Sequence, residues 1–555
     1  MKTSKFKVGI VGGGSIAVSF LHSLTNELKK KQGISEIEIM IFDSRNDLGE
    51  GCYWTNDVDS NILNTRADTM SAMENDKLHF LNWLKENEAA WRPHFPTLKM
   101  SSDAFLPRSL FGLYLRDIFQ SSLSAIKSLN IKFTHIKDDV TDVLRMMNGL
   151  CLDTASSGAF EVNHIVLCMG NLPSTLFSHL KGIDGYHHSP YPSKNMIENI
   201  PKDEPVCVIG TSLSGIDTIV SLAEAGHKGK IVCTSRSGRF PSVRGELSHR
   251  TPPKPITREQ IDLMAEARGG QLRLSDVEKL LVEEIERIEG TKFNLEKILN
   301  AGASAYDYLL NEIELSLTEE RTWQSVVYAT NNVIDYMWHR MDIEDKRKFF
   351  SVYRGLWFRH RVSFPLQNAL KLKELIRTDQ LSIFSGFQEV EYDEHRKSFA
   401  VHLDSCNGGL KSTIFTKHVV NATCYSMDVK NSKIPLIQNL LRRELTASNE
   451  FGGVEVDYET GMLVYPNGTR AHDFSVLGSM ANGVYFWTNA FDVNVRTAAR
   501  QARNLGAKIA QLKSKEDHVL QSDIVIRDAG LGLVSQHNVG KDHESERYSN
   551  TGMAV

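Results

Sequence analysis

The stretch Lys7-Val8-Gly9-Ile10-Val11-Gly12-Gly13-Gly14-Ser15-Ile16-Ala17 decides the fold of the first part of the chain. Residues 7–11 are an apolar run typical of a strand, and residues that favour a helix continue from Ser15 to Leu28. Gly12 and Gly14 allow a sharp turn and a close approach to a pyrophosphate, while Ala17 is small enough for close packing of helix on strand. The first helical residues, Ser15 and Ile16, offer unpaired N–H groups and a partial positive charge. The order strand, turn, helix therefore predicts a dinucleotide-binding unit.

A second strand, residues 37–42, supports this prediction because it ends at Asp43, where a carboxylate would meet a ribose hydroxyl. The spacing from Gly12 to Asp43 exceeds the usual value of about 20 residues. The lysine-rich segment 29–33 is expected to extend the helix and turn, and so to absorb the excess. The alternative is a tight strand-to-helix turn that holds no ligand.

Residues 206–239 repeat the opening pattern. A strand at 206–209, the turn Gly210-Thr211-Ser212-Leu213-Ser214-Gly215, a helix and a strand at 230–234 follow in order. Ser212 stands where glycine is expected, and the segment 235–239, Ser-Arg-Ser-Gly-Arg, replaces the usual acid. Guanidinium groups and hydroxyls suit a 2′-phosphate, which favours NADPH over NADH. The alternative is a basic surface loop. The residues expected to bind this cofactor are Gly210, Ser212, Leu213, Gly215, Ser235, Arg236 and Arg239.

Composition limits the class of protein. A chain of 555 residues should hold two to four domains, and 41% hydrophobic with 24% charged residues is ordinary for a globular protein. A net charge of -4 without a long basic block argues against nucleic acid, and no apolar run is long enough for a membrane helix. The seven cysteines lack Cys-x-x-Cys or metal-binding spacing, so we expect no metal and a reducing, cytoplasmic location.

The pattern predicts an α/β fold with two Rossmann-like domains and a helical insertion; with the resemblance given below, this is an FAD-binding Rossmann-like domain with an inserted NAD(P)-binding Rossmann-like domain and a helical insertion. The helical insertion follows from the charged, amphipathic composition of about 252–345 and would suit a lid or an oligomer contact. The expected parts are 1–195, first part of the FAD-binding domain; 196–250, first part of the NADPH-binding domain; 251–350, helical insertion; 351–415, return of the NADPH-binding domain; 416–512, second part of the FAD-binding domain; and 513–555, a partly disordered tail.

The span from about Lys5 to Leu512 resembles the two-dinucleotide flavoproteins grouped as FAD/NAD(P)-binding proteins, which include flavin-dependent amino-acid N-oxygenases. Five pieces carry the resemblance in order: 12–17; 49–51 with Tyr53 and 63–65; 210–217 with 226–229 and 235–238; 359–361; and Gly478 with 483–484 and Trp487. The segment 417–424 departs from the pattern because Cys424 stands where glycine is usual.

The resemblance implies FAD at the first turn and NADPH at the second. The residues expected at FAD are Gly12, Gly14, Ser15, Ile16, Ala17, Asp43, Gly51, Asn64, Gly170, Gly478, Asn489 and Asp492. Asn489 and Asp492 belong to a loop that feeds a helix expected at 497–512, whose N–H groups would face the flavin ring. For the glycines at 49–51 the alternative is an ordinary surface turn.

The implied activity is that of an NADPH-dependent flavin monooxygenase, which uses O₂ and a flavin C4a-hydroperoxide to oxygenate the amine of a small amino-acid-like substrate. The flavin carries the chemistry, so no catalytic side chain is assigned. Arg66, Arg359 and Arg361 are candidates for a clamp on the substrate's carboxylate, and a solvated or structural salt bridge is the alternative for each.

Other classes share parts of the pattern. A disulfide reductase needs a redox-active thiol pair, whereas Cys52 stands alone after the first domain. An NADPH oxidase would transfer all electrons to oxygen as peroxide, and a nucleotide-sensing protein would bind both cofactors without turnover.

Overall fold

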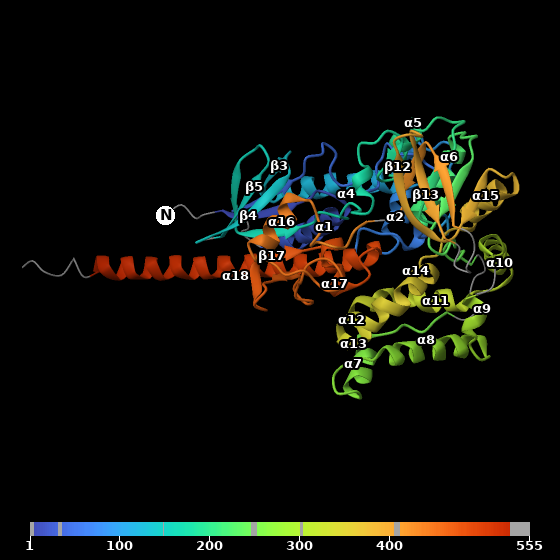
Figure 1. Ribbon diagram of the computed structural model, residues 1–555. Coiled ribbons are helices and arrows are strands. Elements are labelled where there is room, and N and C mark those ends of the chain that lie inside the picture. The colour runs from blue at the N-terminus through green and yellow to red at the C-terminus, as the bar shows by residue number, and fades with distance from the viewer. Residues whose placement is uncertain are drawn as a thin grey trace, which may run out of the picture. The chain divides into compact units, whose positions relative to one another are not determined.

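A computed structural model describes residues 5–31, 36–147, 149–245, 252–299, 304–404, 411–423 and 425–532, with side chains up to Leu512 (Figure 1). The chain divides into two compact units, Met1–Asn504 and Leu505–Val555. The sheets and sites described below lie in the first unit.

The first sheet is built on the N-terminal strand. Its strand order is β16-β17-β7-β1-β2-β3, and all neighbours are parallel except β16 and β17. The bounds are β1 Phe6–Val11, β2 Ile37–Phe42, β3 Lys132–Ile136, β7 His164–Leu167, β16 Met462–Val464 and β17 Arg470–Val476. Every residue of β2 and β7 is buried, as expected for parallel strands covered on both faces. Helices α1 (Ser15–Lys29) and α4 (Arg108–Ser128) pack against each other beside it.

The second sheet is fully parallel and has the order β11-β10-β9-β15-β8. The bounds are β8 Tyr186–His187, β9 Val206–Ile209, β10 Ile231–Thr234, β11 Leu381–Phe384 and β15 His418–Asn421. Helix α6 (Leu213–Glu224) follows β9, and α15 (Leu366–Arg377) packs on α6. The mixed α/β fold with two Rossmann-like sheets confirms the expected fold class.

Strand β15 corrects one expected boundary. We expected residues from 416 onward in the FAD-binding domain, but Val419 pairs with Cys207 in the second sheet. The chain returns to the first sheet only at β16. All four residues of β15 are buried, and such a short apolar strand fits the interior of either parallel sheet, so its sequence does not choose between them.

Two small antiparallel sheets accompany the large ones. One consists of β4 Val140–Met146, β5 Gly149–Thr154 and β6 Ala159–Val162; the other consists of β12 Phe387–Asp393, β13 Ser398–Leu403 and β14 Ser412–Thr416. Tyr392 and Phe399 contact each other across β12 and β13 at 5.1 Å between ring centroids.

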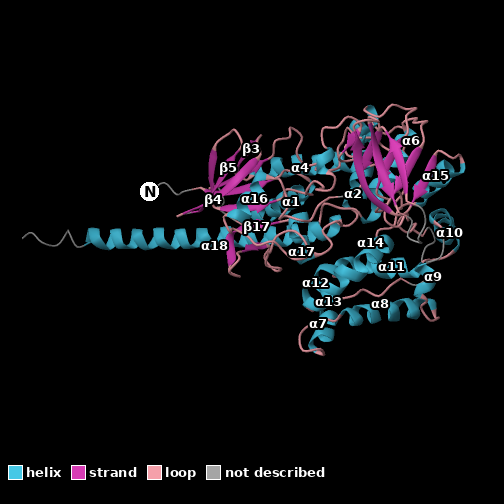
Figure 2. Ribbon diagram, in the orientation of Figure 1, coloured by secondary structure: helices cyan, strands magenta, loops and turns pink. Residues whose placement is uncertain are grey.

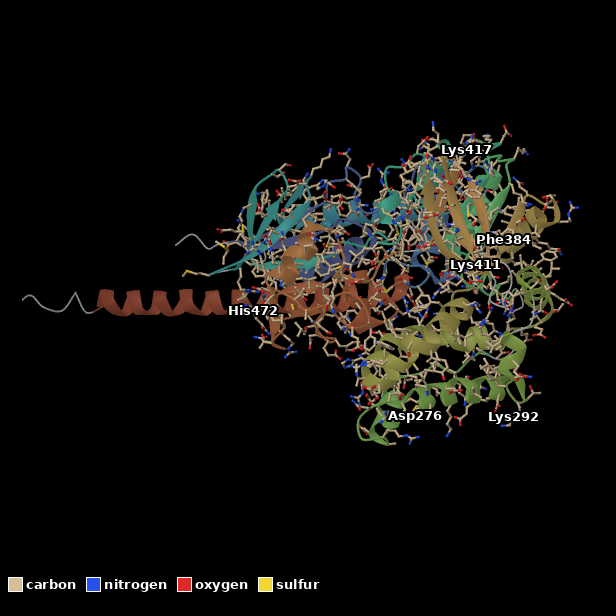
Figure 3. The ribbon with its side chains drawn as sticks, in the orientation of Figure 1. Asp276, Lys292, Phe384, Lys411, Lys417 and His472 are labelled. Atoms are coloured by element: carbon tan, nitrogen blue, oxygen red, sulfur yellow. The ribbon has the colours of Figure 1, made fainter. Side chains whose placement is uncertain are left out.

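Between β10 and β11 the described chain contains helices, their connecting loops and two isolated β-bridges, Val243 with Phe364 and Leu272 with Met341, but no strand longer than a bridge (Figure 2). The helices are α7 Arg258–Glu266, α8 Leu274–Glu289, α9 Leu295–Leu299, α10 Ala305–Thr318, α11 Thr322–Ala329, α12 Ile334–Arg340, α13 Ile343–Lys348, a π-helical turn at Phe349–Tyr353, α14 Arg354–Arg361 and α15. Figure 3 labels Asp276 in the first turn of α8 and Lys292 beyond its end. We call residues 258–361 the helical block. It passes the expected limit at 350 because α14 continues from the π-helical turn.

The remaining helical segments are α2 His79–Glu86, α3 Glu88–Trp91, α5 Ser193–Glu198, α16 Pro435–Arg442, α17 Asn482–Tyr485, α18 Phe491–Gly532 and four 3-10 turns at Ala67–Thr69, Ser178–Leu180, Thr330–Asn332 and Gly478–Ala481. Helix α18 starts before the expected residue 497 and runs to Gly532, into the segment expected as a tail. Among the described residues, none of the helices combines the length and apolarity that a membrane span requires.

Candidate functional site

Three adjacent strands of the first sheet end in glycine turns at the same edge. Gly12 follows β1, Gly170 lies beyond β7, and Gly478 lies beyond β17, with φ of 95°, 74° and 77°. A Cβ on Gly170 would meet no atom within 4 Å, and one on Gly478 would meet only Ile16 at 3.9 Å. This carboxyl edge therefore has open space, as expected where parallel sheets bind ligands.

The turn at Gly12–Gly14 uses its glycines in two ways. Gly12 needs its conformation and its space, because a Cβ there would lie 2.5 Å from the carbonyl oxygen of Cys168. Gly14 has φ -85°, which any residue adopts, but a Cβ would lie 3.3 Å from the Cα of Gly51. Gly14 is the N-cap of α1, and no described side chain caps this helix, so the N–H groups at Ser15 and Ile16 can serve a ligand.

Asp43 lies beside this turn, where the sequence placed it, but its carboxylate is already engaged. Oδ2 accepts the Gly13 N–H at 2.7 Å, and both oxygens accept hydrogen bonds from the Arg45 guanidinium. Burial raises the pKa of Asp43, but the hydrogen bond and charge of Arg45 and the backbone N–H groups outweigh it and lower the pKa. Arg45 also donates to the Gly51 carbonyl at 3.1 Å. Sequence reasoning missed Arg45, although its place two residues after Asp43 is a local signal.

The other residues expected at FAD differ in their surroundings. Ala17 is buried between α1 and the sheet, and the carbonyl of Asn64 accepts a hydrogen bond from Arg244 at 2.7 Å. Asn489 is exposed just before α18, and Asp492 lies in the first turn of that helix. The glycine edge, the uncapped helix and the close approach of Gly51 fit a dinucleotide pyrophosphate.

The second turn, at residues 210–215, has the same backbone geometry as the first, although Ser212 stands where the first turn has Gly14. Gly210 has φ 123°, and a Cβ would lie 2.5 Å from the Ala422 carbonyl oxygen. A Cβ on Gly215 would lie 1.9 Å from the Gly210 oxygen, so α6 packs closely on the turn. Ser212, the residue before Leu213 at the start of α6, has φ -85° and ψ -167°, the same values as Gly14. Serine therefore introduces no backbone strain here. Cys424 lies outside the described residues.

The basic segment 235–239, after β10, is held by hydrogen bonds within the segment and with the turn at Thr211. The Ser235 hydroxyl contacts the Thr211 hydroxyl at 2.9 Å and accepts the Gly238 N–H, also at 2.9 Å. The guanidinium of Arg239 lies over the ring of Tyr308 at 5.2 Å, while Arg236 is exposed. The two arginines thus differ: Arg236 is exposed to solvent, and Arg239 contacts the helical block.

A buried polar network, which we call the bridge, joins the two nucleotide-type domains. Arg108 at the start of α4 forms a 2.7 Å ion pair with Asp217 of α6, and the Tyr191 hydroxyl donates to the same carboxylate. Asn61 donates to Ser193 at 2.8 Å and accepts from Ser221 of α6 at 3.0 Å. The sequence pattern did not predict this network.

The three candidate clamp arginines do not converge. Arg66 is exposed and pairs with Asp68 at 2.7 Å. Arg359 is partly buried, and burial with the nearby charge of Arg239 lowers its pKa despite Tyr308. Arg361 is 5% exposed and lies against the rings of Tyr328 at 4.2 Å and Trp487 at 5.1 Å. Of the three candidates, only Arg361 is buried, and Arg66 forms the salt bridge that was the alternative for it.

No cysteine pair occupies the site within the described part of the chain. The described cysteines Cys52, Cys151, Cys168, Cys207 and Cys233 are all free, and only Cys52 is exposed. The described residues also contain no cluster of three side chains suited to a metal ion.

The arrangement is that of two Rossmann-like folds of the dinucleotide-binding type in one chain, and comparisons with known proteins agree with this fold. Residues 9–172 match the family described as FAD-NAD(P)-binding. A comparison with curated protein sequences gave no significant match.

Solved structures similar to the chain include one monooxygenase and two hydroxylases. L-lysine 6-monooxygenase from Pseudomonas syringae has 13% identity and a TM-score of 0.56 over 90% of this chain and 99% of that one. An ornithine N-hydroxylase from Kutzneria sp. 744, solved with reduced FAD, NADP⁺ and L-ornithine, has 12% identity and a TM-score of 0.53 over 91% and 99%. Ornithine hydroxylase from Pseudomonas aeruginosa has 12% identity and a TM-score of 0.51 over 92% and 99%. At these identities the likeness shows the fold alone.

Proposed function

We propose that the chain is an NADPH-dependent flavin monooxygenase that N-oxygenates the amine of a small amino-acid-like substrate. The observation that carries this proposal is the pair of glycine turns, at Gly12 and Gly210, at the carboxyl ends of two parallel sheets in one chain. Two dinucleotide sites suit a reaction in which one cofactor reduces the other. The similar hydroxylases have the same fold.

FAD would bind at the first turn. The N-terminus of α1 would hold its pyrophosphate, and the open edge at Gly170 and Gly478 would leave room for it. Asp43 would reach the ribose only if Arg45 moved aside, because Arg45 now binds both of its oxygens. When bound, the flavin supplies the redox chemistry. The balanced reaction is amine, O₂, NADPH and a proton giving hydroxylamine, NADP⁺ and water.

NADPH would bind at the second turn, with its pyrophosphate at the N-terminus of α6. No described side chain caps this helix at Ser212, so its first N–H groups can serve an anion. Arg236 is the side chain we assign to the 2′-phosphate, because it is exposed after β10. We expect Arg236→Ala to raise KM for NADPH and leave KM for NADH unchanged; an unaltered NADPH/NADH preference would remove this role.

The test of the activity is a substrate screen on the purified, FAD-loaded protein. NADPH oxidation, peroxide release and product mass are measured in air with candidate amino acids. The proposal expects a product that has gained one oxygen, formed in proportion to the NADPH consumed. If all electrons emerge as peroxide with every amine, the chain is an NADPH oxidase.

A thiol-based reductase is the competing activity, and it would need Cys52. Within the described residues Cys52 has no cysteine partner. We therefore expect Cys52→Ser to leave NADPH-driven flavin reduction unchanged in stopped-flow absorbance. Loss of electron transfer with FAD still bound would favour the reductase.

A further inference from the structure

Two arginines far apart in sequence lie on one tyrosine. The guanidinium of Arg244 lies 4.5 Å from the centroid of the Tyr328 ring, and that of Arg361 lies 4.2 Å from it. Arg244 also donates to the Tyr328 hydroxyl at 2.9 Å. We call this group the Arg244–Arg361 recess. Arg244 was not among the residues singled out from the sequence.

The backbone that carries Arg244 is fixed on both sides. Val243 forms a parallel bridge with Phe364, and the Arg244 N–H donates to the Phe364 carbonyl at 2.9 Å. Glu312 accepts the Val243 N–H at 2.9 Å, and Gln324 donates to the Val243 carbonyl at 2.8 Å. Since Phe364 lies three residues after Arg361, the same bridge sets the two arginines side by side.

Within the described part of the chain, no carboxylate contacts either guanidinium of the recess directly. Arg361 is 5% exposed, and its Nε and the buried Nε of Arg244 have no hydrogen-bond partner among the described residues. The other acceptors near the two guanidiniums are neutral: the Asn331 side chain for Arg361 and the Asn64 carbonyl for Arg244. Asp492 favours the charge of Arg361 from a distance, but its carboxylate lies 4.0 Å from Arg496. A buried guanidinium in this state is stabilised by an incoming anion.

The pKa of the Tyr328 hydroxyl is shifted in the direction that nearby positive charge produces. Burial raises the pKa of its hydroxyl, but the charges of Arg244 and Arg361 and the contact with Ser363 outweigh burial and bring the pKa below the ordinary value. Of the causes that lower the pKa, the two guanidinium charges are the larger, which agrees with their positions on the Tyr328 ring.

The recess borders segments that we assign to the flavin. Asn64 belongs to the loop after Gly51, and Trp487 follows the Gly478 turn and lies 5.1 Å from the Arg361 guanidinium. Trp487 is held by a γ-turn at Phe486, which has φ 59° and ψ -55°, and the Trp487 N–H donates to the Tyr485 carbonyl at 2.6 Å. Such a turn is strained, and strain of this kind gathers at functional sites.

We propose that the Arg244–Arg361 recess binds the carboxylates of an acidic amino acid, of the aspartate or glutamate class, as the substrate whose amine is oxygenated. This inference rests on the proposed function for the reaction but not for the binding. Two guanidiniums can pair with two carboxylates, each through a bidentate contact. An amino acid with a cationic side chain would bring a third positive charge to the recess, so lysine or ornithine should bind poorly.

The test is isothermal titration calorimetry on the FAD-loaded protein with L-aspartate, L-glutamate, succinate, L-ornithine and NADP⁺. We expect an acidic amino acid to bind at least tenfold more tightly than L-ornithine, and succinate to compete with it. Arg244→Met and Arg361→Met should each weaken that binding at least tenfold. Arg361→Lys, which keeps the charge and is less disruptive to folding, should weaken it less than Arg361→Met. The control Arg347→Met removes an exposed arginine of α13 that pairs with Glu344 and Glu450, and it should bind like the wild type.

Two results would overturn the inference. L-ornithine binding as tightly as the acidic amino acids would show that the charge of the recess does not select the substrate. Arg244→Met weakening NADP⁺ and leaving the acidic amino acid unaffected would assign the recess to the second cofactor. Failure of the proposed function is distinguishable, because acidic amino acids would then bind, in an arginine-dependent way, without forming any oxygenated product.

Discussion

Gly14 and Ser212 occupy equivalent positions in two turns and share the same backbone angles, φ -85° and ψ -167°. The preference for glycine at this position therefore comes from space and not from conformation. At Gly14 the space is taken by Gly51, whose Cα would lie 3.3 Å from an added Cβ. Ser212 shows that a small side chain is compatible with the same turn.

Two alanine variants separate conformation from space. Gly12→Ala forces an alanine to φ 95° with its Cβ 2.5 Å from the Cys168 oxygen, so we expect the free energy of unfolding to fall by about 2 kcal/mol or more. Gly14→Ala keeps an ordinary conformation and should stay within about 1 kcal/mol of the wild type, yet retain less FAD because the Cβ crowds the turn. Urea unfolding and the flavin absorbance of the purified protein measure the two effects. Equal stability of the two variants would contradict this division.

The order of strand, turn and helix at these glycines was predictable from the sequence, because a turn of this type depends on local backbone geometry. Arg45 could also have been found, since its partner Asp43 lies two residues before it. Arg244 could not, because the direction of its side chain is set by a distant partner, Tyr328. Residue type alone did not separate exposed Arg66 from Arg361, which is buried at the end of α14.

At the scale of elements, an ion pair and neighbouring contacts connect the helical block to the start of α18. Asp335 of α12 is 2% exposed; it forms a 3.0 Å ion pair with Arg496 and accepts a 2.8 Å hydrogen bond from Tyr458. His339 of the same helix stacks on Tyr458, with the ring centroids 4.1 Å apart. This contact connects the segment that carries Tyr328 with the segment that carries Trp487.

Removing the charge of Asp335 should weaken the contact between α12 and α18. Asp335→Asn leaves Arg496 without its buried partner, and we expect a loss of roughly 3 kcal/mol in the free energy of unfolding. Urea denaturation gives the magnitude, and limited proteolysis shows whether cleavage begins in the helical block. The matched control is Asp492→Asn, whose carboxylate is 41% exposed and lies 4.0 Å from Arg496; it should cost less than about 1 kcal/mol. Similar losses of unfolding free energy in both variants would show that the Asp335–Arg496 ion pair does not hold α12 against α18.

Element types were more predictable than element partners. The helical character of the block follows from periodicity within each helix, and the strand at 418–421 follows from its apolar run. The sheet to which that strand belongs depends on contacts more than 200 residues away, such as Val419 with Cys207, and no local pattern encodes them.

For the whole molecule, we expect histidines that are largely shielded from water to make the free energy of unfolding depend on pH in the acid range. Burial lowers the pKa of His22, His187 and His360 from 6.5 to about 4 in each case, with nearby positive charges adding to the effect. The unfolded chain takes up these protons below about pH 6.5, and the folded chain only near pH 4. The free energy of unfolding should therefore fall as the pH falls through this window, by at most about 1.4 kcal/mol per pH unit for each histidine, and level off below it.

Denaturant unfolding at a series of pH values measures this slope. His187→Gln should reduce it, because the variant has no imidazole to protonate in the unfolded chain. His472→Gln is the control for removing a histidine, because its side chain is 82% exposed; we expect the slope to fall less in this variant than in His187→Gln. An unchanged slope in His187→Gln would show that other groups govern acid sensitivity.

For the proposed reaction, the bridge of Arg108, Tyr191 and Asp217 should affect how the rate of flavin reduction depends on solvent viscosity. A buried ion pair with its hydrogen bonds resists the shearing of one domain against the other, since separating the charges would leave each of them unpaired. If the bridge persists during turnover, the nicotinamide reaches the flavin by small movements of the cofactor and not by diffusion of a whole domain through water. The rate of flavin reduction should then be insensitive to sucrose-induced viscosity in stopped-flow experiments, and become viscosity-dependent in Asp217→Asn.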